Sequence, residues 1–320
     1  MVGVILSLKI MDIILWGGIL FVSLFILVKS ADYFTLGSEK IGLFLGLSPF
    51  IVGATIVSIG GSMPELATSI LAALGGEKNF AIDNVIGSNI ANTLLIGGLV
   101  SIFVGTLKVK EELIDVDLPF FFMSSALFLL FIMDGQFTWQ EGVLTLIMLT
   151  VFIFYTLSSD IKSIQNTQKV ESFQASWILY IIGGSVGIFF GAKYTIEAVS
   201  QLGEILGIAS SIITMLVVAV GTSLPELVIS IRASLKGKHS IALGNIFGSN
   251  TFNSLAVVGV PSLFTTLTTS QTALTFGVPL FIVSTLAFIF TTSDNKIQRW
   301  EGMALLILYG VFVGNIIGFL

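Results

Sequence analysis

The chain contains one segment twice, and this internal repeat restricts its fold more than any other feature. Residues 53–98 align with residues 214–259 without a gap, at a constant offset of 161 positions. The alignment pairs Glu65 with Glu226 and also places the prolines, serines and asparagines of the two copies in register. Segments that share only an apolar composition would match Leu with Val but would not align these polar residues. We therefore infer that an ancestral unit was duplicated.

Most of the chain is apolar enough to cross a membrane. Of its 320 residues, 55% are apolar and 10% are charged, whereas soluble domains carry about 25% charged residues. A spanning helix needs about 20 mostly apolar residues. The sequence therefore predicts an all-α integral membrane protein. Ten transmembrane helices are expected, at residues 11–29, 42–74, 81–104, 116–133, 139–158, 175–194, 206–235, 241–267, 272–292 and 299–319.

Each copy of the repeat lies in a half of the chain with five predicted spans. The first half covers residues 1–158, a polar linker covers 159–174, and the second half covers 175–320. Because five is an odd number, the second half enters the membrane from the opposite side. The sequence thus predicts two five-helix repeats of inverted topology. In secondary transporters built this way, the binding site lies near the midplane at the repeat interface.

The distribution of Lys and Arg gives the expected orientation in the membrane. Of the 14 basic residues, three fall on one side of the predicted spans, namely Lys9, Lys78 and Lys193, and the rest fall on the other side. The basic side is expected to face the cytoplasm. We therefore expect a multi-pass protein of the cell membrane, with both termini outside the cell and the linker 159–174 inside.

Two glutamates lie in the middle of long apolar runs. A charged residue at the bilayer centre costs at least about 2.5 kcal/mol on insertion scales, and such residues are functional hypotheses by default. Glu65 and Glu226 are related by the repeat, so we expect them to meet at the repeat interface. Each follows a proline, Pro64 or Pro225. Proline lacks an N–H and breaks a helix, which frees backbone carbonyl oxygens as cation ligands.

Further oxygen-bearing side chains accompany the glutamates. Ser88 and Asn92 are four residues apart and share one helix face, as do Ser249 and Asn253. The chain has no cysteine and one histidine, so a metal inside the membrane would be held by oxygen. Oxygen ligands favour hard cations such as Na⁺, Ca²⁺ or Mg²⁺. In a membrane helix, however, serine and asparagine also join neighbouring helices by hydrogen bonds without binding an ion. The hydroxyls next to the glutamates belong to Ser62, Ser223 and Thr222.

Asp83 breaks the pattern of the repeat, because its counterpart in the second copy is Gly244. It stands at the start of the third predicted span. It either favours the helix start through the helix dipole or attracts cations in an access path, and the sequence leaves both roles open.

The repeated motifs carry a resemblance to a known group of proteins. GGSMPELATS with GSNIANTLL, and GTSLPELVIS with GSNTFNSLAVVG, resemble the paired repeats of the Ca²⁺/cation antiporter superfamily, and in particular its prokaryotic Na⁺/Ca²⁺ exchanger branch. The resemblance implies ten helices in two inverted halves, with the first and sixth spans sliding against the others. It also implies a set of ion ligands, namely Glu65, Glu226, Ser62, Ser223, Thr222, Ser58, Ala219, Ser88, Asn92, Ser249 and Asn253.

Two positions depart from the pattern of that superfamily. Gly61 stands where the second copy has Thr222, so the first copy lacks one hydroxyl. Asn253 stands where some relatives carry Asp, a residue associated with K⁺ dependence in animal exchangers. The resemblance therefore argues against K⁺ co-transport by this chain.

The expected function is secondary active antiport of Na⁺ and Ca²⁺ by alternating access, electrogenic at three Na⁺ per Ca²⁺ as the resemblance implies. An H⁺/Ca²⁺ exchanger on the same scaffold is the first alternative, because desolvated glutamates can also carry protons. A cation channel is the second, although channels usually build their pore from rings of identical groups. The chain has no Walker-type loop and no long charge run. We therefore expect no enzyme activity, no cofactor, no nucleic-acid partner and no obligate protein partner, only the two ions and the lipid bilayer.

Overall fold

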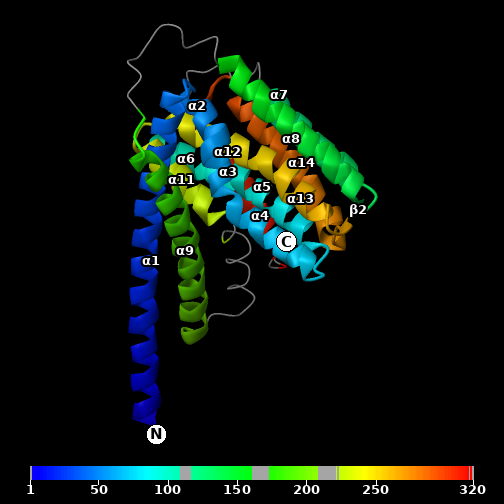
Figure 1. Ribbon diagram of the computed structural model, residues 1–320. Helices are drawn as coiled ribbons and strands as arrows, with labels where there is room; N and C mark the ends of the chain where they lie inside the picture. Colours follow the sequence, from blue (N-terminus) through cyan, green and yellow to red (C-terminus); the bar gives the residue numbers. More distant parts are fainter. Residues whose placement is uncertain are drawn as a thin grey trace.

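The computed structural model describes residues 2–108, 117–160, 173–207, 221, 223–316 and 318. Two long helices, α1 (Val2–Phe44) and α9 (Ser176–Ile205), extend side by side along one edge of the molecule, and the remaining helices form a bundle beside them (Figure 1). These two helices are the first and sixth spans. They pack closely, since a Cβ atom on Gly191 of α9 would lie 2.9 Å from the Cα atom of Leu27.

The spans that carry the repeated motifs are interrupted helices, as the sequence predicts. The second span consists of α2 (Pro49–Val52), a π-helical turn η1 (Gly53–Val57), α3 (Ser58–Gly61) and α4 (Met63–Leu74). The third consists of α5 (Phe80–Ile90), η2 (Ala91–Ile96) and α6 (Gly97–Val104). The seventh is described from α11 (Leu224–Leu235) onward, and the eighth consists of α12 (His239–Phe252), η3 (Asn253–Val257) and α13 (Val258–Ser262).

The other spans flank this interrupted core. They are α7 (Asp117–Ile132), α8 (Trp139–Asp160), η4 (Ala273–Gly277) with α14 (Val278–Thr292), and α15 (Arg299–Ile316). By length and composition, six helices in the described ranges are able to cross a membrane. When each interrupted helix is counted as one span, the described helices form ten spans. The all-α membrane fold with ten helices in two inverted repeats is confirmed.

Two short strand pairs join the halves of the chain. β1 (Thr106–Lys108) pairs antiparallel with β4 (Lys296–Gln298), and β2 (Gln136–Phe137) pairs antiparallel with β3 (Leu267–Thr268). In each pair one strand comes from the first half and one from the second. In the repeat, β1 corresponds to β3 and β2 corresponds to β4, so exchange of the two halves converts one strand pair into the other. Because the halves are inverted, the two pairs lie at opposite ends of the bundle.

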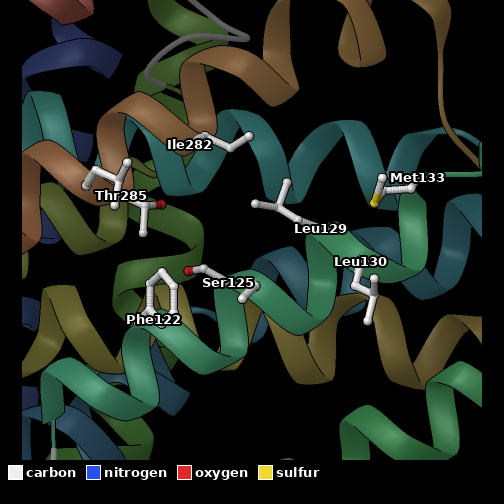
Figure 2. Close-up of a pocket in the computed structure, with 9 residues that line it drawn as sticks. Phe122, Ser125, Leu129, Leu130, Met133, Ile282 and Thr285 are labelled. Carbon is white, nitrogen blue, oxygen red and sulfur yellow. The ribbon is translucent and has the colours of Figure 1, made fainter.

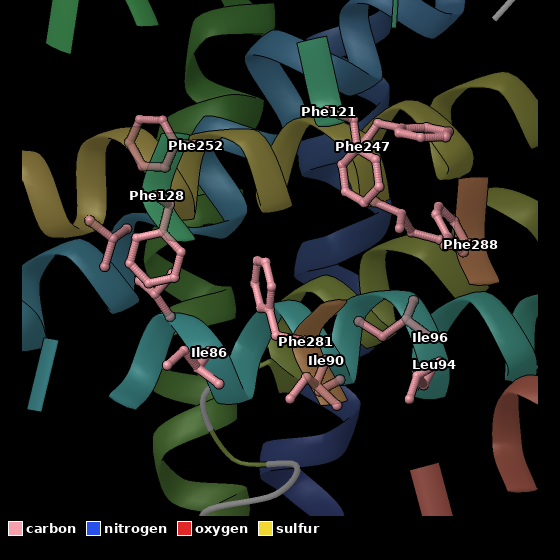
Figure 3. Packing of buried hydrophobic residues seen from close by; sticks show 14 of the residues in the cluster. Ile86, Ile90, Leu94, Ile96, Phe121, Phe128, Phe247, Phe252, Phe281 and Phe288 are labelled. Atoms are coloured by element: carbon pink, nitrogen blue, oxygen red, sulfur yellow. The ribbon is translucent and has the colours of Figure 1, made fainter. Parts of the chain in front are cut away.

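The aromatic core follows the same symmetry. Phe121 of α7 packs on Phe288 of α14 with ring centroids 6.1 Å apart, and Phe128 packs on Phe281 at 5.7 Å. In this part of the repeat the offset is 160 positions, so Phe121 corresponds to Phe281 and Phe128 to Phe288, and exchange of the two halves converts one pair into the other. Phe247 of α12 adds an edge contact to Phe121 at 5.2 Å. Figure 3 shows these rings packed among Ile and Leu side chains of the third span.

Helix ends are the part of the fold that sequence reading placed least well. The sequence predicts the first span at 11–29 and the sixth at 175–194, but α1 continues to Phe44 and α9 to Ile205. Both helices end before a repeat-related glycine with positive φ, Gly46 at 76° and Gly207 at 73°. The eighth span was expected to reach 267, but its helix ends at Ser262, since Leu267 already belongs to β3.

The domain limits at 158 and 175 remain predictions. Most of the linker, residues 161–172, lies outside the described residues.

Candidate cation-binding site

The two proline motifs form matching breaks in the second and seventh spans. Ser62 ends α3 and precedes α4 with φ −89° and ψ 6°, and Ser223 precedes α11 with φ −89° and ψ 9°. Each break is followed by a proline near the helix start and a glutamate in the first helical turn. The positive end of a helix dipole favours an anion there. The breaks thus place Glu65 and Glu226 at the inner ends of two half-helices.

The two glutamates are buried together, each 1% exposed. Their carboxyl groups are near enough to interact with each other. Ser62 of the first half donates a hydrogen bond to Oε1 of Glu226 over 2.9 Å. Among the described residues, neither carboxyl oxygen of Glu65 nor Oε2 of Glu226 has a hydrogen-bond partner. Buried carboxyl oxygens without a donor are costly unless a charge of opposite sign is bound nearby.

The third and eighth spans add amide and hydroxyl oxygens. Asn92 lies in η2 and Asn253 begins η3, and π-helical turns inside α-helices occur frequently at functional sites. Within the described chain, the side-chain oxygens of Asn92, Asn253 and Ser249 are buried without hydrogen-bond partners, and so is that of Ser223. The structure therefore gathers unsatisfied oxygens at the repeat-related positions that the sequence singles out.

Asparagine also serves as a structural link in this region. Asn89 of α5 donates hydrogen bonds to the Ser254 hydroxyl over 2.9 Å and to the Asn250 carbonyl over 3.2 Å. Its own Oδ1 accepts a hydrogen bond from Asn253 over 3.2 Å. These contacts join the third and eighth spans. They also orient the amide of Asn253, because its nitrogen donates a hydrogen bond to Asn89 while its oxygen has no hydrogen-bond partner in the described structure.

Sequence reading did not select Asn245 as a site residue. Its Nδ2 donates to Ser230 over 2.9 Å, while its buried Oδ1 has no partner in the described structure. A Cβ atom added to Gly61 would lie 3.8 Å from this oxygen and 3.7 Å from Cγ of Glu226. The signal was present in the spacing, because Asn245 precedes Ser249 by four residues and shares its helix face.

The remaining predicted site residues have different surroundings. Ser88 is buried beside Asn89 in α5. Ser58 is buried and donates to the Ala54 carbonyl over 2.8 Å, and its hydroxyl faces Gly248 of α12. Thr222 and Ala219 lie outside the described residues.

Asp83 contacts a loop of the other half. One carboxyl oxygen accepts a hydrogen bond from the backbone N–H of Ser270 over 3.3 Å. Ser270 precedes η4, so this contact ties the start of the third span to the connection between the eighth and ninth spans. The geometry favours the structural role that the sequence left open.

One cavity leads to Glu65. It measures about 330 Å³ and lies between α9 and the two helix breaks, where it is lined by Glu65, Pro64, Thr68, Lys193, Ile196 and Pro225, among others. On the α1 side, the buried ring of Phe34 covers the break, because it sits against Gly60 so closely that a Cβ atom there would lie 2.4 Å from it. A separate cavity of about 390 Å³ lies beside this ring. Glu65 lines the cavity next to α9, whereas neither glutamate lines the cavity beside Phe34.

A second cavity, between α7 and α14, is apolar. Figure 2 shows Phe122, Leu129, Leu130, Met133 and Ile282 around it, with the Ser125 and Thr285 hydroxyls as its polar groups. None of the residues that line it is charged. It offers no ligand set for a cation and is therefore not a candidate for the site.

Known proteins share both the sequence pattern and the fold. The family model described as sodium/calcium exchanger protein matches residues 15–158 and 176–318. The sodium/calcium exchanger MaX1 of Methanosarcina acetivorans is 31% identical over 92% of this chain and 96% of its own length. The uncharacterized membrane protein MJ0091 of Methanocaldococcus jannaschii is 32% identical over 95% and 99%, respectively.

A solved structure of a sodium-calcium exchanger has the same fold. The sodium-calcium exchanger NCX_Mj, soaked with zero Na⁺ and Ca²⁺, superposes with a TM-score of 0.82 at 29% identity. The superposition covers 95% of this chain and 99% of that one.

Proposed function

Because the chain belongs to the sodium/calcium exchanger family, and is therefore a cation-exchanging membrane transporter rather than an enzyme, we propose that it exchanges Na⁺ for Ca²⁺ by alternating access. The exchange is electrogenic, with three Na⁺ moved per Ca²⁺. The observation that carries the proposal is the burial of Glu65 and Glu226 side by side with unsatisfied oxygens. The ions are substrates and not cofactors.

The charge of the site supports this exchange. Two carboxylates are neutralised by one Ca²⁺ or by two Na⁺, and a third Na⁺ would then rest on neutral oxygens. Ca²⁺ takes six to eight oxygen ligands in flexible geometry. The carboxyl, amide and hydroxyl oxygens of the four interrupted spans supply such a set. We assign the ion ligands to Glu65, Glu226, Ser62, Ser223, Ser88, Asn92, Ser249 and Asn253, with Asn245 added, and to Thr222, Ala219 and Ser58 from the family resemblance.

The distribution of Lys and Arg supports an orientation with both termini outside the cell. In this orientation the cavity that reaches Glu65 opens outward, because α4 runs from the helix break toward the loop that contains Lys78. Phe34 then closes the cytoplasmic approach. Inward movement of Na⁺ down its gradient would drive Ca²⁺ out of the cell.

The test is calcium uptake by reconstituted liposomes. Liposomes loaded with Na⁺ are diluted into Na⁺-free buffer that contains radioactive Ca²⁺, and the membrane potential is set with K⁺ and valinomycin. We expect uptake to require internal Na⁺ and to increase with an inside-positive potential, because three positive charges leave for every two that enter.

A parallel sample carries an imposed pH gradient and no Na⁺. Uptake driven by that gradient and indifferent to Na⁺ would replace the proposal with H⁺/Ca²⁺ exchange. A steady conductance without a counter-ion would replace it with a channel.

A further inference from the structure

Two carboxylates of α1 form ion pairs with the end of the seventh span. Asp32 receives two hydrogen bonds from Arg232, from Nε over 3.0 Å and from an Nη atom over 2.7 Å, and its carboxylate lies 2.9 Å from Nζ of Lys236. Two turns further along α1, Glu39 pairs with Lys238. The carboxylate of Asp32 is mostly buried and that of Glu39 is three-quarters buried. These pairs attach α1 to the bundle through α11 and the loop that follows it.

The ion pairs lie at the closed end of the ion path. Phe34, which fills the approach to the helix break at Gly60, stands on α1 between Asp32 and Glu39. α11 runs from the buried Glu226 to this end, whereas its counterpart α4 runs from Glu65 to the open end. Separation of α1 from α11 at this point would uncover the approach that Phe34 closes.

Among the described residues, the open end has no equivalent set of ion pairs. At the repeat offset of 161 positions, Asp32 corresponds to Lys193 and Arg232 to Leu71. Glu39 corresponds to Ser200, and Lys236 corresponds to Gly75. An inverted repeat with identical halves would stabilise the two end states equally. At the same offset Lys238 corresponds to Glu77, so the open end keeps two charged residues, Lys193 and Glu77, but neither forms an ion pair in the described structure. The ion pairs between α1 and the seventh span therefore have no counterpart among the described residues of the other end, and the two states differ in energy.

We propose that Asp32 and Glu39, with Arg232, Lys236 and Lys238, form a latch that holds one end of the transport path shut and separates once in each cycle. They are positioning residues, since they act through Phe34 and α1 and do not contact the ions. The latch rests on the alternating access proposed above. It makes the state with Glu65 accessible the resting state in the absence of ions.

Cysteine labelling tests the latch, because the chain has no cysteine of its own. One reporter, Ile196→Cys, lines the cavity that reaches Glu65, and the other, Ile59→Cys, lies beside Gly60 in the cavity of about 390 Å³ at the closed end. Each is introduced separately into otherwise unchanged protein in nanodiscs, where a water-soluble maleimide reaches both faces. The labelling rate reports which end is open, and it does not depend on transport.

Neutralisation of the latch is expected to change the labelling rates of the two cysteine reporters in opposite directions. With Asp32→Asn or Glu39→Gln, the labelling rate at the closed end should rise about threefold, and with both about tenfold, as for partly exposed ion pairs. The rate at the open end should fall. Glu197→Gln, which removes an exposed carboxylate of α9, is the matched control and should change neither rate.

A charge swap shows whether a variant acts by breaking the Glu39–Lys238 ion pair or by destabilising the protein in general. Glu39→Lys alone should open the closed end, and Glu39→Lys combined with Lys238→Glu should restore the original rates. Rates that stay unchanged in all variants, or that rise equally at both ends, would overturn the latch. The labelling assay and the uptake assay can fail independently. If labelling confirms the latch in protein that does not exchange Na⁺ for Ca²⁺, the proposal for the exchanged ions is wrong and the latch is retained.

Discussion

The hydroxyl of Ser62 in the first half donates a hydrogen bond to the carboxylate of Glu226 in the second half over 2.9 Å. Residues that are 164 positions apart thus share one site. Each half supplies part of the oxygen set, so the site that we propose for the ions lies where the two halves meet.

Both glutamates are expected to be essential for transport. Glu65→Gln or Glu226→Gln keeps the shape of the side chain but removes a negative charge that a Ca²⁺ ion needs inside the membrane. We expect uptake to fall more than about 100-fold, the effect of losing one partner of a buried charge pair. Uptake by reconstituted liposomes measures the loss, and a monodisperse gel-filtration peak shows that the variants fold. Unimpaired uptake in either variant would remove that glutamate from the site.

Ser62→Ala removes the one described donor to the Glu226 carboxylate and a potential ligand. A hydrogen bond to a charged group contributes about 1.5–3 kcal/mol, so the apparent affinity for Ca²⁺ should fall about tenfold or more. The measurement is the Ca²⁺ dependence of the initial uptake rate. Ser124→Ala is the control, because that buried hydroxyl of α7 donates only to the Phe121 carbonyl. Equal affinities in the two variants would show that the Ser62 contact plays no part in binding.

Exchange should not require K⁺. Asn253 supplies a neutral amide whose nitrogen is held by Asn89, so the site lacks a third carboxylate to balance another monovalent cation. Uptake rates are compared with K⁺ present and with K⁺ replaced by choline on both sides of the membrane. We expect the rates to agree within twofold. A strict K⁺ requirement would contradict the assignment of Asn253.

Close packing between the halves should make the stability of the protein sensitive to substitution of one glycine of α15. A Cβ atom on Gly302 would lie 1.9 Å from the Ser101 hydroxyl and 2.9 Å from the Gly98 carbonyl. Gly302→Ala should therefore lower stability by about 1–3 kcal/mol, the usual effect of overpacking. Gly310→Ala in the same helix meets nothing within 4 Å and should be neutral or stabilising, because alanine favours helix. Thermal unfolding in detergent compares the two variants, and equal midpoints would contradict the packing argument.

Much of the fold and part of the site could be predicted from the sequence. The repeat offset and the apolar spans are properties of the chain itself, so they led to ten helices, two inverted halves and the paired glutamates. The length of α1 could not be read in the same way. Lys29, Asp32 and Glu39 look like loop residues to a hydropathy argument, because the partners of the two carboxylates lie in the second half of the chain.

The details of the site escaped prediction for a similar reason. An asparagine in a membrane helix either binds an ion or joins two helices, and the choice depends on which groups of the opposite half face it. Asn89 became a link because Ser254 and Asn250 stand beside it. Asn92 carries the same side chain in the next turn of the span, and its amide has no partner in the described structure.

The two strand pairs determine which parts of the molecule are able to move. β1–β4 ties the halves together at one membrane face and β2–β3 ties them at the other. A rocking motion of one half against the other would have to tear open a pair of backbone ladders at every turnover. In the alternating access that we propose, the core therefore moves as a single block, and the motion falls to α1 and α9, which contribute no strand to either pair.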